Sequence, residues 1–450
     1  KMKAKKILAS VLAGLMLLAT AGCNNNGGGS TASGSTASGG SSEGVIEVSI
    51  PSYKTGENVG AVFFEPQVER FNEKYEGQYK INLETVPQDG FGDRLKQLAQ
   101  QNKLPVLVQG GDLDWILNVV IPNGLAWDMT DWLEESGLLE RAVQDSVDYN
   151  KDKGDGKIYT IPKMTVRPTG FYYNTAMWNP EEDLSSLTMD ELVTLLGDQK
   201  IAFSTAENGW VSALFLTAFI ANQEGGVELL QAGADEKITD FSDPIFVNAV
   251  ASLQQLLQNN AASNSIGAAY ADAANAFMSG QAAVIANGPW MSSEFNESNS
   301  ANWSNGFDGA NVKASLFPGN VGIENNRAFG EWWISASASE EEIELAKAFL
   351  EFISSPEELE AYLLAEGGDA PNIEYSEDFK EKQAETQVLA DLAADTTEET
   401  GYVPCILDVI PNSVANTEFG KLLPSLANGT YTPEEFCDWM TQKSVEASAE

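Results

Sequence analysis

The sequence predicts an α/β fold, and three observations point to it. Short segments in which apolar and polar residues alternate are separated by segments in which apolar residues recur at helical spacing. This succession of strand-like and helical segments continues to the C-terminus, with no fixed-period repeat. The chain has 450 residues, of which 43% are hydrophobic, enough to build the cores of two to three domains.

The first elements of the folded part are predicted from periodicity. Alternation predicts strands at 46–50 and 79–83, and a short apolar run predicts a buried third strand at 105–108. Between them, helical spacing predicts helices at 64–75 and around 95–98. This β-α-β-α-β order implies parallel strands joined by right-handed crossovers.

Later elements are marked by turn and capping residues. A turn at Asp155-Gly156 precedes a predicted strand at 157–162, and further strands are predicted at 171–173 and 200–203. Three helix starts have Ser or Thr three residues before Glu, the pattern of a capping box: Thr188 with Glu191, Ser339 with Glu342, and Thr432 with Glu435, the last followed by Pro433 at the first helical position.

Three loops follow the first three predicted strands, at 51–60, 86–92 and 109–115. Ligands of open α/β sheets bind outside the carboxyl ends of the strands, so these loops are candidate ligand contacts on topology alone. The first and third loops carry the side chains that we single out: Lys54, Glu57, Asn58, Asp112, Asp114 and Trp115.

The charge balance and the missing histidine exclude several classes of function. The chain has 26 Lys and Arg against 66 Asp and Glu, a net charge of −40 that disfavours nucleic acid as a partner. Histidine is absent, which removes Ser-His-Asp and Cys-His catalysis, His-based zinc sites and haem ligated by His. Carboxylate chemistry remains open.

We expect neither a cofactor nor a metal. The three cysteines are too few for a Cys₄ zinc site. The pattern at 148–159 begins like a calcium loop, but it has Lys153 and Tyr159 where such a loop needs Gly and Glu. Cys405 and Cys437 can pair in an exported protein or stay as separate thiols, and the sequence leaves both readings open.

The N-terminus is typical of an export segment. Lysines at 1–6 precede an apolar run at 7–21, which is shorter than the roughly 20 residues of a membrane-spanning helix. The run ends in Ala-Gly-Cys23, which resembles a bacterial lipoprotein signal, although Thr20 stands where such signals usually carry Leu. A plain secretory signal with an incidental Cys is the alternative.

The lipoprotein reading divides the N-terminal region into two parts. Residues 1–22 are the predicted signal peptide, and residues 23–44 are the lipidated Cys23 with a tether of small polar residues. It implies attachment to the outer face of a bacterial cytoplasmic membrane through the lipid alone, because no later stretch is long and apolar enough to span one.

Three motifs in the rest of the chain carry a family resemblance. They are Asp155–Pro162 with Phe171–Asn174, then Phe277–Trp290, then Ala346–Ile353 with Glu366–Pro371. Their order and spacing, together with the leader, resemble the family 1 extracellular solute-binding proteins of ABC importers along most of residues 45–450.

The resemblance implies a periplasmic-binding-protein-like fold of two lobes with a ligand cleft between them. Three interlobe crossings are implied, near 164–168, 328–334 and 367–373. The N-lobe would comprise 45–165 plus 335–370, and the C-lobe 168–330 plus 373–450. A monomer of this kind closes on its ligand and delivers it to the permease subunits of an importer.

Aromatic residues in the implied cleft are candidate sugar contacts, because an indole can cover the apolar face of a pyranose. Trp290 follows Gly-Pro, which predicts a loop position, and the matching Trp stacks on sugar in a member of the family. Of Trp332 and Trp333, which point to opposite faces of an extended segment, at most one faces the ligand, and we favour Trp332. Trp210, in a predicted loop, is a further candidate, with core packing as the alternative. Trp115, which follows two aspartates on the third loop, is another candidate.

Polar candidates complete the predicted site. Asp112 and Asp114 can accept hydrogen bonds from sugar hydroxyls, or can be solvated helix caps. Arg167 at the first crossing can bind a hydroxyl or an acidic sugar, and Glu331 and Asp369 lie at the second and third crossings. Simple surface exposure is the alternative for these three.

The prediction is therefore a lipid-anchored binding protein that captures an oligosaccharide for an ABC importer and performs no reaction. A secreted glycoside hydrolase is one alternative, since two carboxylates suffice for that chemistry. The same fold with another solute, such as a polyamine, a metal chelate or a peptide, is the other.

Overall fold

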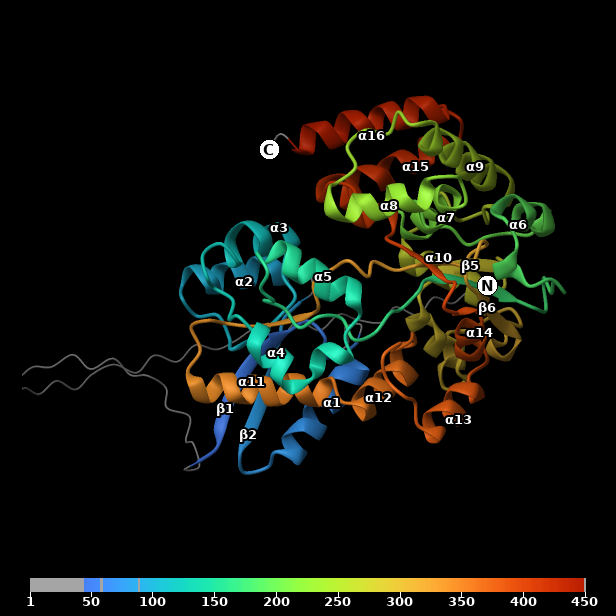
Figure 1. Ribbon diagram of the computed structural model, residues 1–450. Helices are drawn as coiled ribbons and strands as arrows, with labels where there is room; N and C mark the ends of the chain where they lie inside the picture. The colour runs from blue at the N-terminus through green and yellow to red at the C-terminus, as the bar shows by residue number, and fades with distance from the viewer. Residues whose placement is uncertain (1–43, 57–59, 88–89, 449–450) are drawn as a thin grey trace, which may run out of the picture. The chain divides into compact units, whose positions relative to one another are not determined.

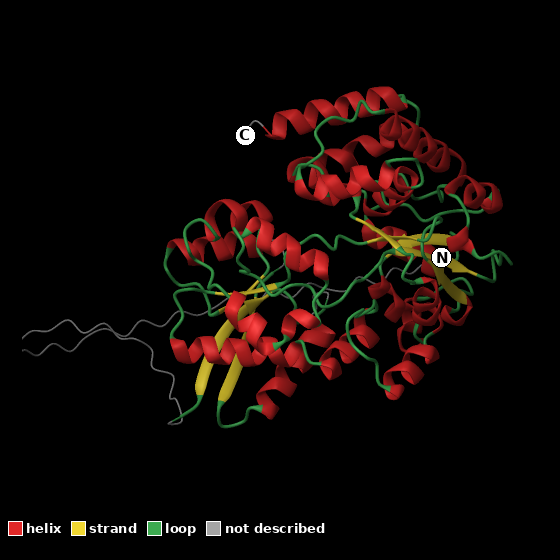
Figure 2. Cartoon of the chain, in the orientation of Figure 1, coloured by secondary structure: helices red, strands yellow, loops and turns green. Residues whose placement is uncertain are grey.

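The computed structural model describes residues 44–56, 60–87 and 90–448 (Figure 1). The predicted signal peptide, Cys23 and the tether up to residue 43 lie outside the described residues, as do Glu57 and Asn58. Figure 2 shows helices surrounding short strands that gather in two groups. None of the helices in the described part of the chain is long and apolar enough to cross a membrane.

The apolar core has two large clusters of buried side chains. One draws its residues from 48–164 and 332–359, and the other from 171–323 and 388–440. We call the parts of the chain around these clusters the N-lobe and the C-lobe. Three segments connect them, at 165–170, 324–331 and 360–387.

The N-lobe is built on two small sheets covered by helices. Its strands are β1 (Ile46–Ser52), β2 (Tyr79–Thr85), β3 (Leu107–Gln109) and β8 (Trp332–Ile334). Its helices are α1 (Ala61–Lys74), α2 (Phe91–Gln100), α3 (Leu113–Trp115), α4 (Thr130–Ser136), α5 (Gln144–Lys153) and α11 (Glu340–Ile353). Figure 1 shows α11 in orange beside β1 and β2 in blue, so the C-terminal half of the chain completes this lobe.

The β1-α1-β2 unit confirms the predicted strand–helix–strand order. β1 and β2 pair in parallel, from Ile46 with Tyr79 to Ser52 with Thr85. The third strand differs from the prediction, because β3 pairs with β8 and the pairing is antiparallel. Periodicity near the N-terminus cannot reveal this partner, which comes much later in the chain.

The C-lobe has the central sheet β5-β4-β6 and a two-stranded β7-β9 sheet. The strands are β4 (Gly170–Asn174), β5 (Val284–Asn287), β6 (Val312–Ser315), β7 (Val321–Ile323) and β9 (Gly401–Val403). The helices are α6 (Met189–Leu196), α7 (Trp210–Ala221), α8 (Gly226–Asp235), α9 (Pro244–Asn260), α10 (Tyr270–Met278), α14 (Gln387–Asp395), α15 (Phe419–Ala427) and α16 (Pro433–Ser448). Every residue of α7 after Trp210 is buried, and apolar side chains lie on all sides of the helix, as expected inside a core.

Two predicted strands are extended segments without regular pairing. Residues 157–162 lie outside any strand, although the Ile161 amide donates to the Trp332 carbonyl at 2.8 Å. Residues 200–203 form only isolated bridges at Ile201. By contrast, the capping boxes at Thr188 and Ser339 are present with both reciprocal hydrogen bonds.

The first and third connecting segments are joined to each other by their backbones. The amides of Val166 and Asp369 each donate to the other residue's carbonyl at 2.8 Å. α12 (Pro356–Glu366) leads from the N-lobe into the third segment, which also contains α13 (Glu377–Glu385), and a small cluster of Leu363, Ala370 and Phe379 packs between the two helices. The first and third connections are therefore linked by hydrogen bonds and do not run independently between the lobes.

Candidate functional site

A cavity of about 560 Å³ lies where the three connecting segments meet the lobes. The end of β1, the start of α1, residues 161–167 and residues 328–332 form most of its wall. α12 contributes Tyr362 and Glu366, and Trp290 reaches it from the C-lobe. A cavity of this size with aromatic and polar walls is typical of a small-molecule site.

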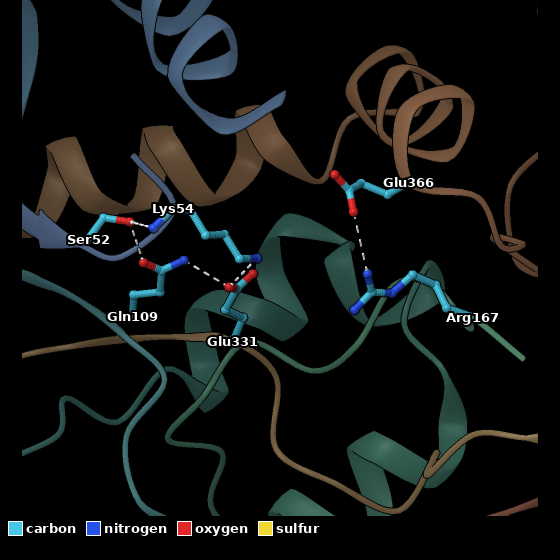
Figure 3. Close-up of polar contacts among 6 residues, drawn as sticks. All are labelled: Ser52, Lys54, Gln109, Arg167, Glu331 and Glu366. Atoms are coloured by element: carbon cyan, nitrogen blue, oxygen red, sulfur yellow. Dashed lines mark hydrogen bonds and ion pairs between the residues drawn. The ribbon is translucent and has the colours of Figure 1, made fainter. Parts of the chain in front are cut away.

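One wall of the cavity carries a connected polar network (Figure 3). Glu331 forms an ion pair with Lys54 at 2.5 Å and accepts a hydrogen bond from Gln109 at 2.8 Å. Gln109 in turn accepts from the Ser52 hydroxyl at 2.6 Å. The Glu331 side chain is 40% exposed; partial loss of hydration opposes its charge, but Lys54 and Gln109 outweigh this effect and hold the pKa of the carboxyl below its usual 4.5.

A second ion pair joins Lys163 and Glu324 across the same cavity. The Lys163 ammonium also donates to the Asn325 carbonyl at 2.8 Å. Because Lys163 precedes the first connecting segment and Glu324 begins the second, this contact ties the second connection to the N-lobe.

Arg167 lies between two aromatic rings. Its guanidinium is 5.4 Å from the ring centre of Trp290 and 5.6 Å from that of Tyr362. Its nearest carboxylate is Glu366, at 3.9 Å. Burial opposes the charge, but Tyr362 and Glu324 act in the other direction and the pKa of Arg167 is raised, so it stays a cation.

The charged residues of the lining balance one another. Lys54, Lys163 and Arg167 face Glu331, Glu324 and Glu366. In a chain with a net charge of −40, this cavity is locally close to neutral.

Trp290 occupies a different structure from the predicted loop. It is the second residue of the 3₁₀ helix η4 (Pro289–Phe295), which Pro289 begins. Its ring packs directly on Gly288, where an added Cβ would come within 2.1 Å of the indole. Gly288 therefore covers the indole from below, and Arg167 lies over it.

Two further aromatic residues adjoin Trp290 from the C-lobe. Trp210, predicted in a loop, is the first residue of α7, because Gly209 begins that helix with a left-handed conformation. Its ring centre is 6.5 Å from that of Trp290. The Tyr270 hydroxyl lies 3.4 Å from the indole nitrogen of Trp290 and hydrogen-bonds to Asn287. Trp210 is half-buried but does not line the cavity.

Trp332 and Trp333 point to opposite faces of β8, as expected. Trp332 is 3% exposed, stacks on Phe64 at 5.6 Å in the N-lobe core and touches the cavity from below. Trp333 is 1% exposed and packs with Trp115 in a separate small cluster. Its indole nitrogen donates to the Gly110 carbonyl at 2.8 Å. Trp333 and Trp115 are placed in the core rather than in the cavity wall.

Three predicted acidic residues lie outside the cavity lining. Asp112 caps α3, accepting from the amides of Asp114 and Trp115 at 3.0 and 3.3 Å. Asp114 accepts from Asn412 of the C-lobe at 3.2 Å. Asp369 accepts from the Tyr375 hydroxyl at 2.5 Å, behind the third connection.

The structure thus brings together Lys54, Arg167, Trp290, Glu331 and Trp332. Periodicity reasoning missed Tyr362 and Glu366, although their spacing of four places both on one face of a helix that ends at Gly367. That signal, beside a predicted crossing, was present in the sequence.

The described residues carry no other obvious chemistry. They contain no group of three or more Cys, Asp or Glu side chains that could hold a metal ion. Cys405 and Cys437 are buried and unpaired, and burial raises the pKa of each thiol to about 12.

Solved structures of similar fold are numerous. One is a chitin oligosaccharide binding protein, 20% identical over 90% of this chain and 99% of its own, with a TM-score of 0.65. Another is a Streptococcus pneumoniae solute-binding protein in complex with the blood group A-trisaccharide, 19% identical over 90% of this chain and 100% of its own, with a TM-score of 0.65. A third is RafE in complex with raffinose, 16% identical over 89% of this chain and 99% of its own, with a TM-score of 0.61.

These likenesses confirm the two-lobe α/β fold. Among curated protein sequences, none matches the chain. A family model described as bacterial extracellular solute-binding protein matches residues 67–390, which include most of both lobes and every connection. The chain therefore belongs to the bacterial extracellular solute-binding proteins.

Proposed function

We propose that the protein captures an oligosaccharide in the cavity between its lobes and delivers it to the permease subunits of an ABC importer. The observation that carries this is the cavity of about 560 Å³, with aromatic side chains and balanced charges in its wall. Structural neighbours include a chitin oligosaccharide binding protein and proteins in complex with the blood group A-trisaccharide and with raffinose, which supports a sugar here.

The connecting segments support capture by hinge closure. We propose domain boundaries that assign most of the connecting residues to one lobe or the other: residues 45–165 plus 335–370 for the N-lobe and residues 168–330 plus 373–450 for the C-lobe. Rotation about the connections would bring C-lobe groups such as Trp290 and Trp210 onto a ligand that lies against the N-lobe wall of the cavity.

The cavity is better suited to binding than to glycoside hydrolysis or polyamine capture. A general acid needs a carboxyl whose pKa is raised, whereas that of Glu331 is lowered by Lys54. A polyamine needs carboxylates free of cations, whereas Glu324 and Glu331 are each paired with a lysine. A hydroxyl-rich neutral ligand meets neither difficulty.

Titration calorimetry tests the proposal on the full chain carrying Cys23→Ser, which cannot be lipidated. The panel is chitotetraose, xylotetraose, maltotetraose and raffinose, with spermidine and putrescine as the non-sugar arm. We expect heat from at least one glycan, none from either polyamine, and an unchanged glycan on chromatography afterwards. Heat from a polyamine alone, or steady release of shorter sugars, would refute oligosaccharide capture.

We also propose that a lipid on Cys23 holds the protein at the outer face of the cytoplasmic membrane. The lipoprotein-like leader supports this. Labelled palmitate should enter the wild-type protein in a bacterial host, and Cys23→Ser should move the protein from the membrane fraction to the medium. Equal labelling of both forms would exclude Cys23 as the acceptor.

A further inference from the structure

The polar groups of the cavity wall differ in whether they already have hydrogen-bond or ion-pair partners within the protein. Lys54, Glu331 and Gln109 bond one another, and Lys163 bonds Glu324 and a backbone carbonyl. Because these groups already bond to one another, they can form fewer hydrogen bonds with a ligand. They fit the role of a rigid cavity wall that is formed before the ligand binds.

Arg167, Glu366 and Tyr362 form a second set. In residues 44–56, 60–87 and 90–448, none of these three side chains makes a hydrogen bond to another residue. The closest approach between Arg167 and Glu366 is 3.9 Å, too long for a hydrogen bond, and Figure 3 shows the two side chains facing each other across that gap. Their side chains are 34% and 17% exposed, so their polar atoms reach the cavity without being open surface groups.

Two aromatic rings lie close to the guanidinium. The ring centres of Trp290 and Tyr362 are 5.4 and 5.6 Å from it, within the range of cation–π attraction. This attraction uses none of the N–H groups as hydrogen-bond donors, so they remain available to a ligand. Glu366 lies four residues after Tyr362 on α12, so one helix presents both the ring and the carboxylate.

The chemistry of this gap selects the group that can fill it. Arg167 offers only donors and Glu366 only acceptors. A hydroxyl satisfies both, because it accepts from one and donates to the other. A ligand carboxylate would be attracted by Arg167 but repelled by Glu366. A ligand ammonium would be attracted by Glu366 but repelled by Arg167.

We propose that Arg167, Glu366 and Tyr362 form a subsite that binds the adjacent hydroxyls of one uncharged sugar unit and rejects acidic sugars. This deepens the proposed function and rests on it. Tyr362 and Trp290 position the guanidinium, and Glu366 sets the preference for an uncharged ligand.

The test compares each glycan with its own acidic form. Chitotetraose, maltotetraose and raffinose are titrated into the unlipidated full chain beside the same sugars oxidised at C6 to carboxylates. We expect the neutral form of any glycan that binds to bind about tenfold or more tightly than its carboxylate form. Equal or tighter binding of the carboxylate form overturns the subsite.

Two substitutions separate the subsite from the cavity as a whole. Glu366→Gln keeps the shape of the side chain but loses its charge, so neutral glycan should bind about tenfold more weakly. The ratio of the affinity for the neutral glycan to that for its carboxylate form should also decrease. Arg167→Lys keeps the charge but loses the planar fork, and it should weaken both forms. Glu357→Gln, an exposed residue at the start of the same helix, is the matched control and should bind like the parent chain.

Thermal unfolding of each variant shows whether it is folded before its affinity is read. Folded Glu366→Gln protein with both affinities unchanged overturns the subsite while leaving oligosaccharide capture intact. If the parent chain binds no glycan of either form, the proposed function fails, and the subsite with it.

Discussion

At the scale of single residues, the cavity wall contains two kinds of polar side chain. Some are hydrogen-bonded or ion-paired to one another, and others keep hydrogen-bonding capacity for a ligand. Lys54 and Glu331 stabilise each other and tie β1 to the second connecting segment. Arg167 is instead held by aromatic faces, with its carboxylate partner just out of hydrogen-bond range. The first arrangement builds the wall, and the second leaves bonding capacity for a ligand.

Trp290 is expected to matter for binding in two ways, through its own contact with the sugar and through its hold on Arg167. Trp290→Ala should therefore weaken glycan binding by at least about tenfold without unfolding the protein. Isothermal titration against the glycan identified in the panel measures the effect. Trp439→Ala, which removes a half-buried tryptophan of α16 outside the cavity, is the control. Unchanged affinity in Trp290→Ala would remove this residue from the site.

The Lys54–Glu331 pair makes a prediction about pH. The pKa of Glu331 in the folded protein is lowered below its usual 4.5, so its stabilising effect is present above that value and is lost as the pH falls through the lowered pKa. Glu331→Gln should be less stable than wild type at pH 7, and the difference in the free energy of unfolding should shrink towards pH 3. Urea denaturation at both pH values measures this, and a difference that stays constant would contradict it.

At the scale of elements, the connecting segments are packed closely against one another. Val166 pairs with Asp369, and Gly330 of the second connection lies against the backbone of Ile161. A Cβ added to Gly330 would lie 1.6 Å from the Ile161 carbonyl oxygen. A side chain at this position therefore has to push the second connection away from the N-lobe segment at Ile161, and both residues border the cavity.

Gly330→Ala should consequently destabilise the protein by about 1–3 kcal/mol or more, as overpacking does. Gly92→Ala is the matched control, since Gly92 lies in α2 with open space around it and without a positive φ. That change should be neutral or stabilise the protein by up to about 1 kcal/mol. Chemical denaturation of both variants decides, and equal effects would show that the close approach at Gly330 is not a constraint.

Local patterns in the sequence predict many helices and strands, but they do not predict which strands pair when the partners lie far apart in the chain. The β1-α1-β2 unit and the capping boxes at Thr188 and Ser339 depend on residues close in sequence, and all are present. The pairing of β3 with β8 depends on a strand from the far half of the chain.

The same limit applies to the site. Alternation along β8 predicted that Trp332 and Trp333 face opposite ways, but only packing against Phe64 and Trp115 shows that both are buried. Arg167 and Glu331 were identified because crossings of a two-lobe fold border a cleft. Tyr362 and Glu366 were missed because their importance comes from where α12 docks.

At the scale of the whole molecule, the strong acidity is spread outside a nearly neutral cavity. With 66 acidic and 26 basic side chains, one-to-one pairing leaves at least 40 carboxylates without a basic partner. The charge balance of the lining shows that this excess belongs to the rest of the protein and not to the ligand site.

Excess like charge destabilises a folded chain through mutual repulsion, and salt screens that repulsion. Surface ion pairs weaken in salt as well, but each contributes little, and the unpaired carboxylates outnumber the basic residues that could form such pairs. The melting temperature should therefore rise from about 10 mM to about 150 mM NaCl, as the Debye length falls from about 30 Å to about 8 Å. Calorimetry in NaCl and in choline chloride measures this, and both salts should act alike because both screen equally. A melting temperature that stays constant or falls as salt is added would mean that the ion pairs outweigh the repulsion. A melting temperature that rises in NaCl but not in choline chloride would indicate sodium binding instead of screening.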